Sequence, residues 1–233
     1  MSDNKEISTT GTTEIVNETA AHRKAPQDFL TAYGKKIIIA AIAVIVVCLG
    51  YFGYKNFVVA PKEEKANDAI WKAQQFYAMD SISLALNGDG ANAGFEKIAK
   101  NYAGTKAGEL AKFYAGSCAL KLGQFDKAVS FLKDFNTEAK EIKVASLTNL
   151  ADAYSELGKN ADAVATYVKA SEVFPEYDEV SSENLFRAGL LSEVSGKKED
   201  AIKYYQKIKE KYSKTNRGFE VEKRLATLGI VEN

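Results

Sequence analysis

The residue types that most often carry chemistry are scarce in this sequence of 233 residues. It holds one histidine, His22, and two cysteines, Cys48 and Cys118. Zinc, haem and iron–sulfur sites need several such ligands close together, so these three residues predict neither a metal centre nor a bound cofactor. Two cysteines are also too few for a disulfide-dense scaffold. Cys48 lies inside a long apolar run and Cys118 outside it, so we do not expect them to pair.

Motifs for catalysis are missing from the sequence as well. It contains no H-E-x-x-H, G-x-S-x-G or G-x-x-x-x-G-K-[ST] pattern, and no G-x-G-x-x-G before a predicted helix. Carboxylates are frequent, but they are spread over predicted helix surfaces, where such groups are usually solvated or paired. Lys plus Arg and Asp plus Glu both total 31, so no excess charge indicates nucleic acid binding. We therefore predict a protein that is not an enzyme and has no nucleic acid or small-molecule substrate.

The apolar run that contains Cys48 covers residues 37–54, which are 18 residues without a charge. As a helix with a rise of about 1.5 Å per residue it is about 27 Å long, close to the hydrocarbon core of a bilayer. Tyr33 and Tyr54 lie near its ends, where aromatic rings suit the membrane interface. A core helix would have a polar face, whereas apolar residues here lie on every face. We predict a transmembrane helix over residues 35–57.

The flanks of this helix indicate how it is inserted. Because 36 residues precede the run and no A-x-A site follows it, we expect a retained anchor rather than a cleaved signal peptide. Four basic residues precede the run and three follow it, namely Arg23, Lys24, Lys35, Lys36, Lys55, Lys62 and Lys65. This bias favours a cytoplasmic N-terminus and an exported C-terminal domain. Residues 1–34, which include His22, are predicted as a disordered cytoplasmic tail because their first part is polar and without apolar period.

Residues 62–233 carry a helical repeat, because apolar residues recur at i, i+3 and i+4. Residues 144–177 match the 34-residue tetratricopeptide pattern at its diagnostic positions, which are Leu147, Leu150, Ala151, Tyr154, Gly158, Ala163, Tyr167, Ala170 and Pro175. The small residues let two antiparallel helices approach closely, and the tyrosines fill the space between repeats. Gly158 is expected to leave its helix in a left-handed conformation.

The same tetratricopeptide pattern continues on both sides of residues 144–177. Glycines at the expected turns lie 35 and then 38 residues apart, at Gly123, Gly158 and Gly196. They define three repeats, at about 109–142, 144–177 and 182–213. Residues 62–104 are predicted as a degenerate first repeat, interrupted by a loop at 87–93, and 216–229 as a C-terminal capping helix. The expected fold is all-α, a tetratricopeptide (TPR) helical solenoid preceded by one transmembrane helix.

A further likeness lies outside this frame. The segment 97–105 parallels the segment 207–215, and each reads as the end of one helix and the start of the next. This parallel supports the assignment of residues 62–104 to the repeat array.

Repeat arrays of this kind present a concave surface lined by the first helix of each repeat. Placing the pattern on these helices predicts a partner-binding groove formed by Leu110, Phe113, Leu120, Lys121, Asp152, Glu156, Phe186, Leu190 and Glu193. Its apolar members would bind an apolar or amphipathic segment of another protein. A single lysine, Lys121, is too little to recognise a peptide C-terminus. The alternative is that the chain's own cap, or its segment 66–86, fills the groove.

The order of these parts resembles a known family, the YfgM-like tetratricopeptide proteins, which are single-pass inner-membrane proteins of bacteria. The likeness consists of the polar tail, the basic approach at residues 33–36, one span, a helix with Trp71, and F-x-x-I-x-x-x-Y-x-x-T from Phe95 to Thr105. The resemblance implies a periplasmic accessory subunit of the SecYEG protein-conducting channel. It would act beside a PpiD-like periplasmic chaperone on exported client chains, without a catalytic residue of its own.

Two other functions remain open from the sequence. The chain could be a scaffold for another envelope assembly, in cell division, outer-membrane biogenesis or secretion. It could also be a regulator whose cytoplasmic tail binds a signalling protein. If the isolated tail binds no protein, that result would argue against a regulator.

Overall fold

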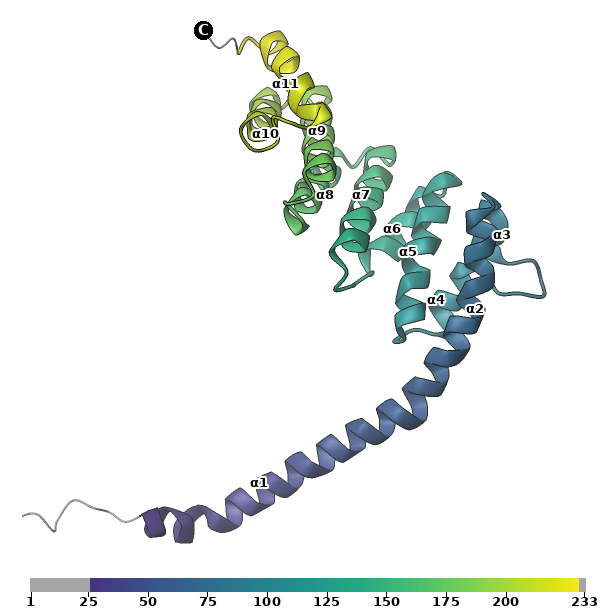
Figure 1. Ribbon diagram of the computed structural model, residues 1–233, viewed down its shortest axis with the longest axis vertical. Helices are drawn as coiled ribbons and strands as arrows, with labels where there is room; N and C mark the ends of the chain where they lie inside the picture. Colours follow the sequence, from purple (N-terminus) through teal and green to yellow (C-terminus); the bar gives the residue numbers. More distant parts are fainter. Residues whose placement is uncertain (1–25, 231–233) are drawn as a thin grey trace, which may run out of the picture. The chain divides into compact units, whose positions relative to one another are not determined.

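A computed structural model describes residues 26–230, with side chains from Tyr33 onward (Figure 1). The chain divides into two compact units, Met1–Asn56 and Phe57–Asn233, and each is described by itself. The predicted tail residues 1–25, with His22, lie outside the described residues. Within the described residues the chain is almost entirely helical, with no strand beyond an isolated bridge between Gly88 and Ala93. The predicted all-α class is confirmed.

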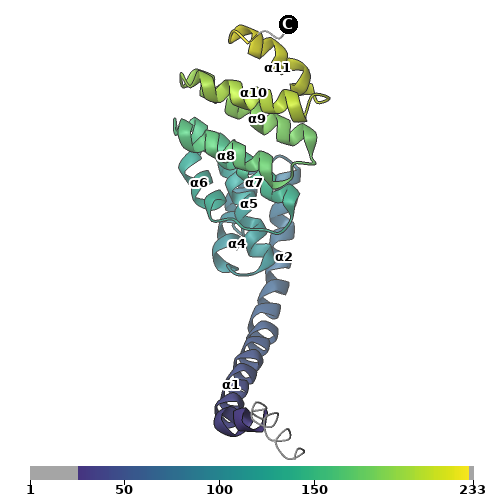
Figure 2. The same ribbon diagram turned by 90° about the vertical axis from the view of Figure 1, so that its left-hand side faces the viewer.

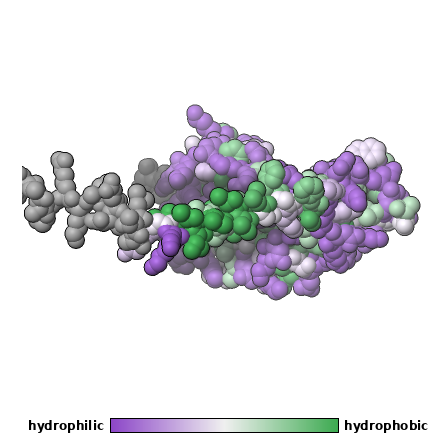
Figure 3. All heavy atoms as spheres, turned by 90° about the horizontal axis from the view of Figure 1, so that it is seen from below, coloured by the Kyte–Doolittle hydropathy of each residue, from purple (hydrophilic) through white to green (hydrophobic). Residues whose placement is uncertain are grey.

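The described part of the first unit consists of helix α1 (Pro26–Tyr54) and the two residues that follow it. It begins eight residues before the predicted tail ends, because proline is well tolerated in the first turn of a helix, where its missing N–H needs no partner. Its apolar side chains form a continuous hydrophobic surface, which Figure 3 shows in green. In the described chain this is the helix that is long and apolar enough to cross a membrane, judged by length and composition, and none of its apolar window is buried.

Helical structure does not stop at the predicted end of the span, residue 57. A π-helical turn (Lys55–Val59) follows, and helix α2 (Ala60–Ala78) continues from it. The wide turn lies just before Pro61, whose nitrogen cannot donate the hydrogen bond that a regular helix needs. Residues 58–61, between the predicted span and the predicted first repeat, are therefore helical.

The second unit is an array of antiparallel helices, seen from two sides in Figures 1 and 2. After α2 come α3 (Ile82–Asn87), α4 (Phe95–Asn101), α5 (Lys106–Lys121), α6 (Phe125–Lys133), α7 (Lys140–Glu156), α8 (Asn160–Val173), α9 (Asp178–Val194), α10 (Lys198–Lys211) and α11 (Asn216–Thr227). Each helix packs on the next along the chain, and α5 also packs on α7, as α9 does on α11. The segment predicted as a degenerate first repeat holds three helices, α2 to α4, rather than the two of a regular repeat.

In the described chain, five helices end in the same way. The residue after each helix's last turn has a positive φ, between 54° and 80° in every case, at Asp80, Gly123, Gly158, Gly196 and Gly229. Its amide donates to the carbonyl three residues earlier, and the next amide donates to the carbonyl five residues before itself. This hydrogen-bonded ending favours glycine because a side chain is strained there. It identifies α2, α5, α7, α9 and α11 as equivalent first helices.

The two helices of a repeat approach closely at one position, seven residues before the turn glycine. A Cβ added at Gly116 would lie 2.4 Å from Cγ of Leu132, and one added at Gly189 would lie 2.3 Å from Cε1 of Tyr205. Ala151 occupies the same position in the repeat between them and is fully buried. Small residues recur there because the facing helix leaves no space for larger ones.

The two similar segments, 97–105 and 207–215, each end in a threonine that caps the N-terminus of the next helix. The hydroxyls of Thr105 and Thr215 accept hydrogen bonds from the amides of Gly108 and Gly218, at 2.9 and 3.0 Å. Each hydroxyl also donates to the carbonyl of a tyrosine three residues earlier, at 2.7 Å. The expectation that each segment ends one helix and begins the next is confirmed, and its cause is the capping of α5 and α11.

Candidate partner-binding surface

The first helices are joined along the array by polar side chains at about the repeat spacing. Asn149 Nδ2 donates to Ser117 Oγ at 2.9 Å, which connects α7 to α5. Arg187 Nη1 lies 2.9 Å from Asp152 Oδ1, which connects α9 to α7. Arg217 Nε lies 2.6 Å from Glu183 Oε2, which connects α11 to α9. We call these three contacts the polar ladder.

The centre of the polar ladder is the carboxylate of Asp152, which accepts hydrogen bonds from the Tyr167 hydroxyl and from Arg187. Burial and the neighbouring carboxylate both raise the pKa of Tyr167, so its hydroxyl keeps its proton. Burial lowers the pKa of Arg187, but hydrogen bonding to Glu183 and the charges of Asp152 and Glu183 outweigh it and raise the pKa overall. Tyr167 and Arg187 therefore both keep their protons near neutral pH.

Four of the predicted groove residues come together in one surface pocket of about 530 Å³. They are Leu120, Lys121, Asp152 and Glu156. The pocket is polar, because Tyr167 and Arg187 also line it. The Lys121 ammonium lies 3.6 Å from Asp80 and 4.9 Å from the centre of the Tyr77 ring, so the segment 66–86 reaches the edge of this surface.

Leu110 and Phe113 lie closer to the other end of α5. Leu110 lines a separate pocket of about 510 Å³ together with Phe135 and Ile142. The Phe113 ring is 5.8 Å from that of Phe135 and 5.3 Å from that of Tyr114, so it is half-buried against its neighbours. The predicted apolar groove is therefore divided, with Leu110 in one pocket and Leu120 in another.

The part of the predicted groove on α9 is covered by the chain itself. Phe186 is only 2% exposed, and the guanidinium of Arg217 lies 4.1 Å from its ring centre. Leu190 packs against the same cluster, and Glu193 accepts a hydrogen bond from the Tyr205 hydroxyl. In this part the alternative from the sequence holds, because the cap helix α11 occupies the space over Phe186.

A profile of the tetratricopeptide repeat-like domain family matches residues 27–229, which is most of the chain. The chain belongs to this family. A crystal structure of BtubC (BKLC) from P. vanneervenii is similar to this TPR protein, with 16% sequence identity and a TM-score of 0.42, over 73% of this chain. The TPR protein spans 65% of the length of that structure. A comparison with curated proteins found no match.

Two arginines of the TPR protein's surface were not among the predicted groove residues. Arg187 follows Asp152 by 35 residues and Arg217 follows Glu183 by 34, so each opposite charge appears one repeat later. Opposite charges at the repeat spacing on first helices are a signal that sequence reasoning could have used.

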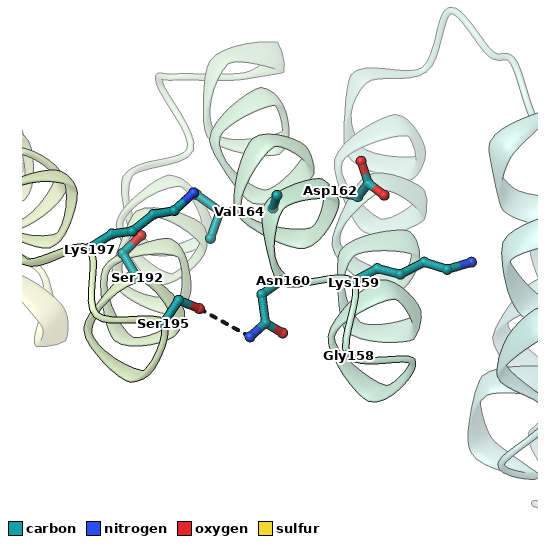
Figure 4. A pocket seen from close by; sticks show the side chains of 9 residues that line it. Gly158, Lys159, Asn160, Asp162, Val164, Ser192, Ser195 and Lys197 are labelled. Carbon is teal, nitrogen blue, oxygen red and sulfur yellow. Dashed lines mark hydrogen bonds between the residues drawn. The ribbon is translucent and has the colours of Figure 1, made fainter.

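Another pocket of the TPR protein, of about 500 Å³, lies at the turns that follow α7 and α9 (Figure 4). Asn160 Nδ2 donates to Ser195 Oγ at 3.1 Å across it, which joins two turns that are one repeat apart. Lys159 and Lys197 follow the two turn glycines and line the same pocket. Its residues connect neighbouring repeats, and none of them belongs to the predicted groove.

The described residues offer little reactive chemistry. Between residues 33 and 230, no group of three or more His, Cys, Asp or Glu side chains could hold a metal ion. Cys118 is fully buried, and burial raises the pKa of its thiol to about 12, so it is not a nucleophile at neutral pH. The surfaces of this TPR protein are suited to contacts with other proteins.

Proposed function

We propose that this TPR protein is a membrane-anchored adaptor that binds other proteins through its solenoid. The observation that carries the proposal is the exposed apolar surface of α1, where Ile39 is 67% exposed and Val47 is 70% exposed. A helix that exposes apolar side chains on every face is stable only when a bilayer or a partner covers it. Membership of a repeat family supports protein partners, because such arrays bind other chains along their surface.

In its more specific form, the proposal places the solenoid in the periplasm, beside the SecYEG channel and a PpiD-like chaperone. The resemblance to the YfgM-like proteins supports this form, as does the basic bias before the span. The anchor would hold the solenoid near the channel exit and raise its concentration around newly exported client chains or partner chaperones. No chemical step is required of the protein, since its contribution is to keep partners close together.

The orientation can be tested with single cysteines. In a Cys48→Ser background, where buried Cys118 reacts slowly, we would introduce Ser213→Cys in the solenoid or Ser8→Cys in the tail. A membrane-impermeant maleimide, applied to cells with a permeabilised outer membrane, should label residue 213 and leave residue 8 unlabelled. The opposite pattern would overturn the periplasmic assignment.

The partners can be tested by purification from native membranes in mild detergent through a tag at the C-terminus. Recovery of the Sec channel and a periplasmic chaperone in stoichiometric amounts is the expected result. Recovery of another envelope complex in their place would overturn the Sec assignment and leave an anchored scaffold. Extraction of the chain from membranes by alkaline carbonate would overturn the anchor itself.

A further inference from the structure

An apolar pocket of about 510 Å³ opens between the starts of α5 and α7. Its apolar wall consists of Leu110 from α5, Ile142 from α7 and Phe135 from the connection between α6 and α7, and all three are half-buried. Charged residues of both signs, Lys106 and Glu138, lie exposed at its rim. Such a pocket fits a large apolar side chain whose neighbours in sequence are polar.

The pocket is open because the connection around it is long. Residues 134–139 separate α6 from α7, whereas residues 174–177 suffice between α8 and α9. The longer connection is held by few hydrogen bonds, which include one from the Phe135 amide to Leu132 and one from the Ala139 amide to Thr137 Oγ1. It therefore leaves space between two first helices instead of closing it.

The start of α5, beside this pocket, is hydrogen-bonded to Lys62 and Glu63, which lie eight and nine residues after the end of the apolar run. The carboxylate of Glu63 accepts hydrogen bonds from the amides of Lys106 and Ala107, at 2.7 and 2.9 Å. Lys62 Nζ donates to the carbonyl of Ala103 at 2.9 Å. Glu63 is nine residues from Tyr54, and nine residues span at most about 30 Å of extended chain. Chain length therefore keeps the backbone of Glu63 within about 30 Å of Tyr54, and Lys106 is hydrogen-bonded to the Glu63 side chain.

The size of the pocket restricts its occupant. One or two buried side chains contribute too little for a stable complex between freely diffusing proteins. The same contact becomes populated when both proteins are held in one membrane, because the effective concentration rises. We propose that this pocket binds an apolar side chain from the segment next to a transmembrane span of another membrane protein. This inference rests on the proposed anchoring of the chain.

The proposal can be tested with a photoreactive phenylalanine analogue, p-benzoyl-phenylalanine, in the full-length chain in native membranes. Placed at Phe135 or Ile142, it should crosslink to a protein that has its own membrane span. The crosslinked peptide should lie within about 20 residues of that span. Each residue extends the chain by at most about 3.5 Å, so 20 residues reach at most about 70 Å, which is ample for the distance of about 30 Å given above. The matched control is Phe219, which is 74% exposed on α11 and should yield several-fold less of this product.

A pair of matched substitutions tests the pocket without removing its apolar wall. Ala139 and Ala161 are both exposed alanines that line pockets, but only Ala139 lines this one. Ala139→Phe should fill the pocket and lower the crosslink from Ile142 several-fold, while Ala161→Phe should leave it unchanged. Circular dichroism of both variants checks that the fold is kept, and Thr137→Trp provides a second way to fill the pocket.

The outcomes separate this inference from the proposed function. Crosslinks to lipid, to a second copy of this chain or to a client without a span would overturn the inference, as would no crosslink at all. So would a crosslink that persists in both pocket-filling variants. If the chain stays in membranes and its partners are still recovered in these cases, the adaptor function stands. If carbonate extracts the chain, the proposed function fails first.

Discussion

Asp152 and Arg187 form an ion pair at 2.9 Å that connects two successive repeats. Asp152 lies six residues before its turn glycine, and Arg187 lies nine before its own. Ser117 and Asn149, which form the preceding step of the polar ladder at 2.9 Å, lie at the same two positions of their repeats. The same geometry is thus used twice, once with a hydroxyl and an amide and once with two charges.

This pair should couple measurably in a double-mutant cycle of Asp152→Asn and Arg187→Gln. Both side chains are partly exposed, at 28% and 40%, so we expect a coupling energy of about 1 kcal/mol. Urea unfolding of the detergent-solubilised chain gives the four free energies of unfolding. The control cycle is Asp80→Asn with Lys121→Gln, whose atoms are 3.6 Å apart and whose side chains are 85% and 50% exposed. A coupling energy no larger than that of the control would contradict the structural importance of the ladder.

Gly189→Ala should destabilise the solenoid because its new Cβ would lie 2.3 Å from the Tyr205 ring. The ring or the helix must shift, and overpacking of this kind typically costs about 1–3 kcal/mol. Gly158→Ala is the comparison, since it faces open space and has a φ of 69°, so its cost of about 1 kcal/mol comes from the backbone alone. Thermal unfolding by circular dichroism measures both. Equal midpoints for Gly189→Ala and the native chain would show that the helices do not pack this closely.

Glu63→Ala should weaken the N-terminus of α5. The carboxylate of Glu63 accepts hydrogen bonds from the amides of Lys106 and Ala107, and the loss of a capping group typically costs about 0.5–2 kcal/mol. Hydrogen exchange at residues 106 and 107 should accelerate, while exchange in α9 stays as it was. Glu64→Ala is the control, because Glu64 is exposed on the same helix. Identical exchange in the two variants would contradict the cap.

The stability of the C-terminal repeats should fall below about pH 4.5, the ordinary pKa of a glutamate. Burial raises the pKa of Glu183, but hydrogen bonds from Arg217 and Arg187 outweigh it and lower the pKa overall. A carboxylate with a lowered pKa in the folded state stabilises the fold above its unfolded pKa, and this stabilisation is lost as pH falls through the folded value. Between pH 5 and 8 its contribution should be constant.

Glu183→Gln should therefore reduce the acid-induced loss of the melting temperature between pH 5 and 3. The control is Glu222→Gln, whose side chain is 69% exposed and lies 3.8 Å from Lys209. It should keep the pH dependence of the native chain. If both variants follow the native curve, Glu183 does not contribute to acid sensitivity.

The local features of this fold follow from the sequence because short-range physics decides them. Gly158 was expected to adopt a left-handed backbone, and its φ of 69° confirms it; Gly123 and Gly196, expected at equivalent turns, have φ values of 70° and 72°. The parallel between residues 97–105 and 207–215 indicated equivalent helix boundaries, which the Thr105 and Thr215 caps explain. The uninterrupted apolar run likewise indicated a helix that no other element buries. Each of these depends on residues within a few positions of one another.

Only the tertiary structure decided which parts of the inner surface are accessible. The pattern placed Phe186 in an open groove, but Arg217, 31 residues later, covers its ring at 4.1 Å. The hydrogen bond from the Lys106 amide to the Glu63 carboxylate joins residues 43 positions apart, and no local sequence pattern indicates it. The burial of a side chain depends on all elements that pack against it, and those elements can be distant in sequence. Periodicity therefore determined which face of each helix is apolar, and packing determined what covers that face.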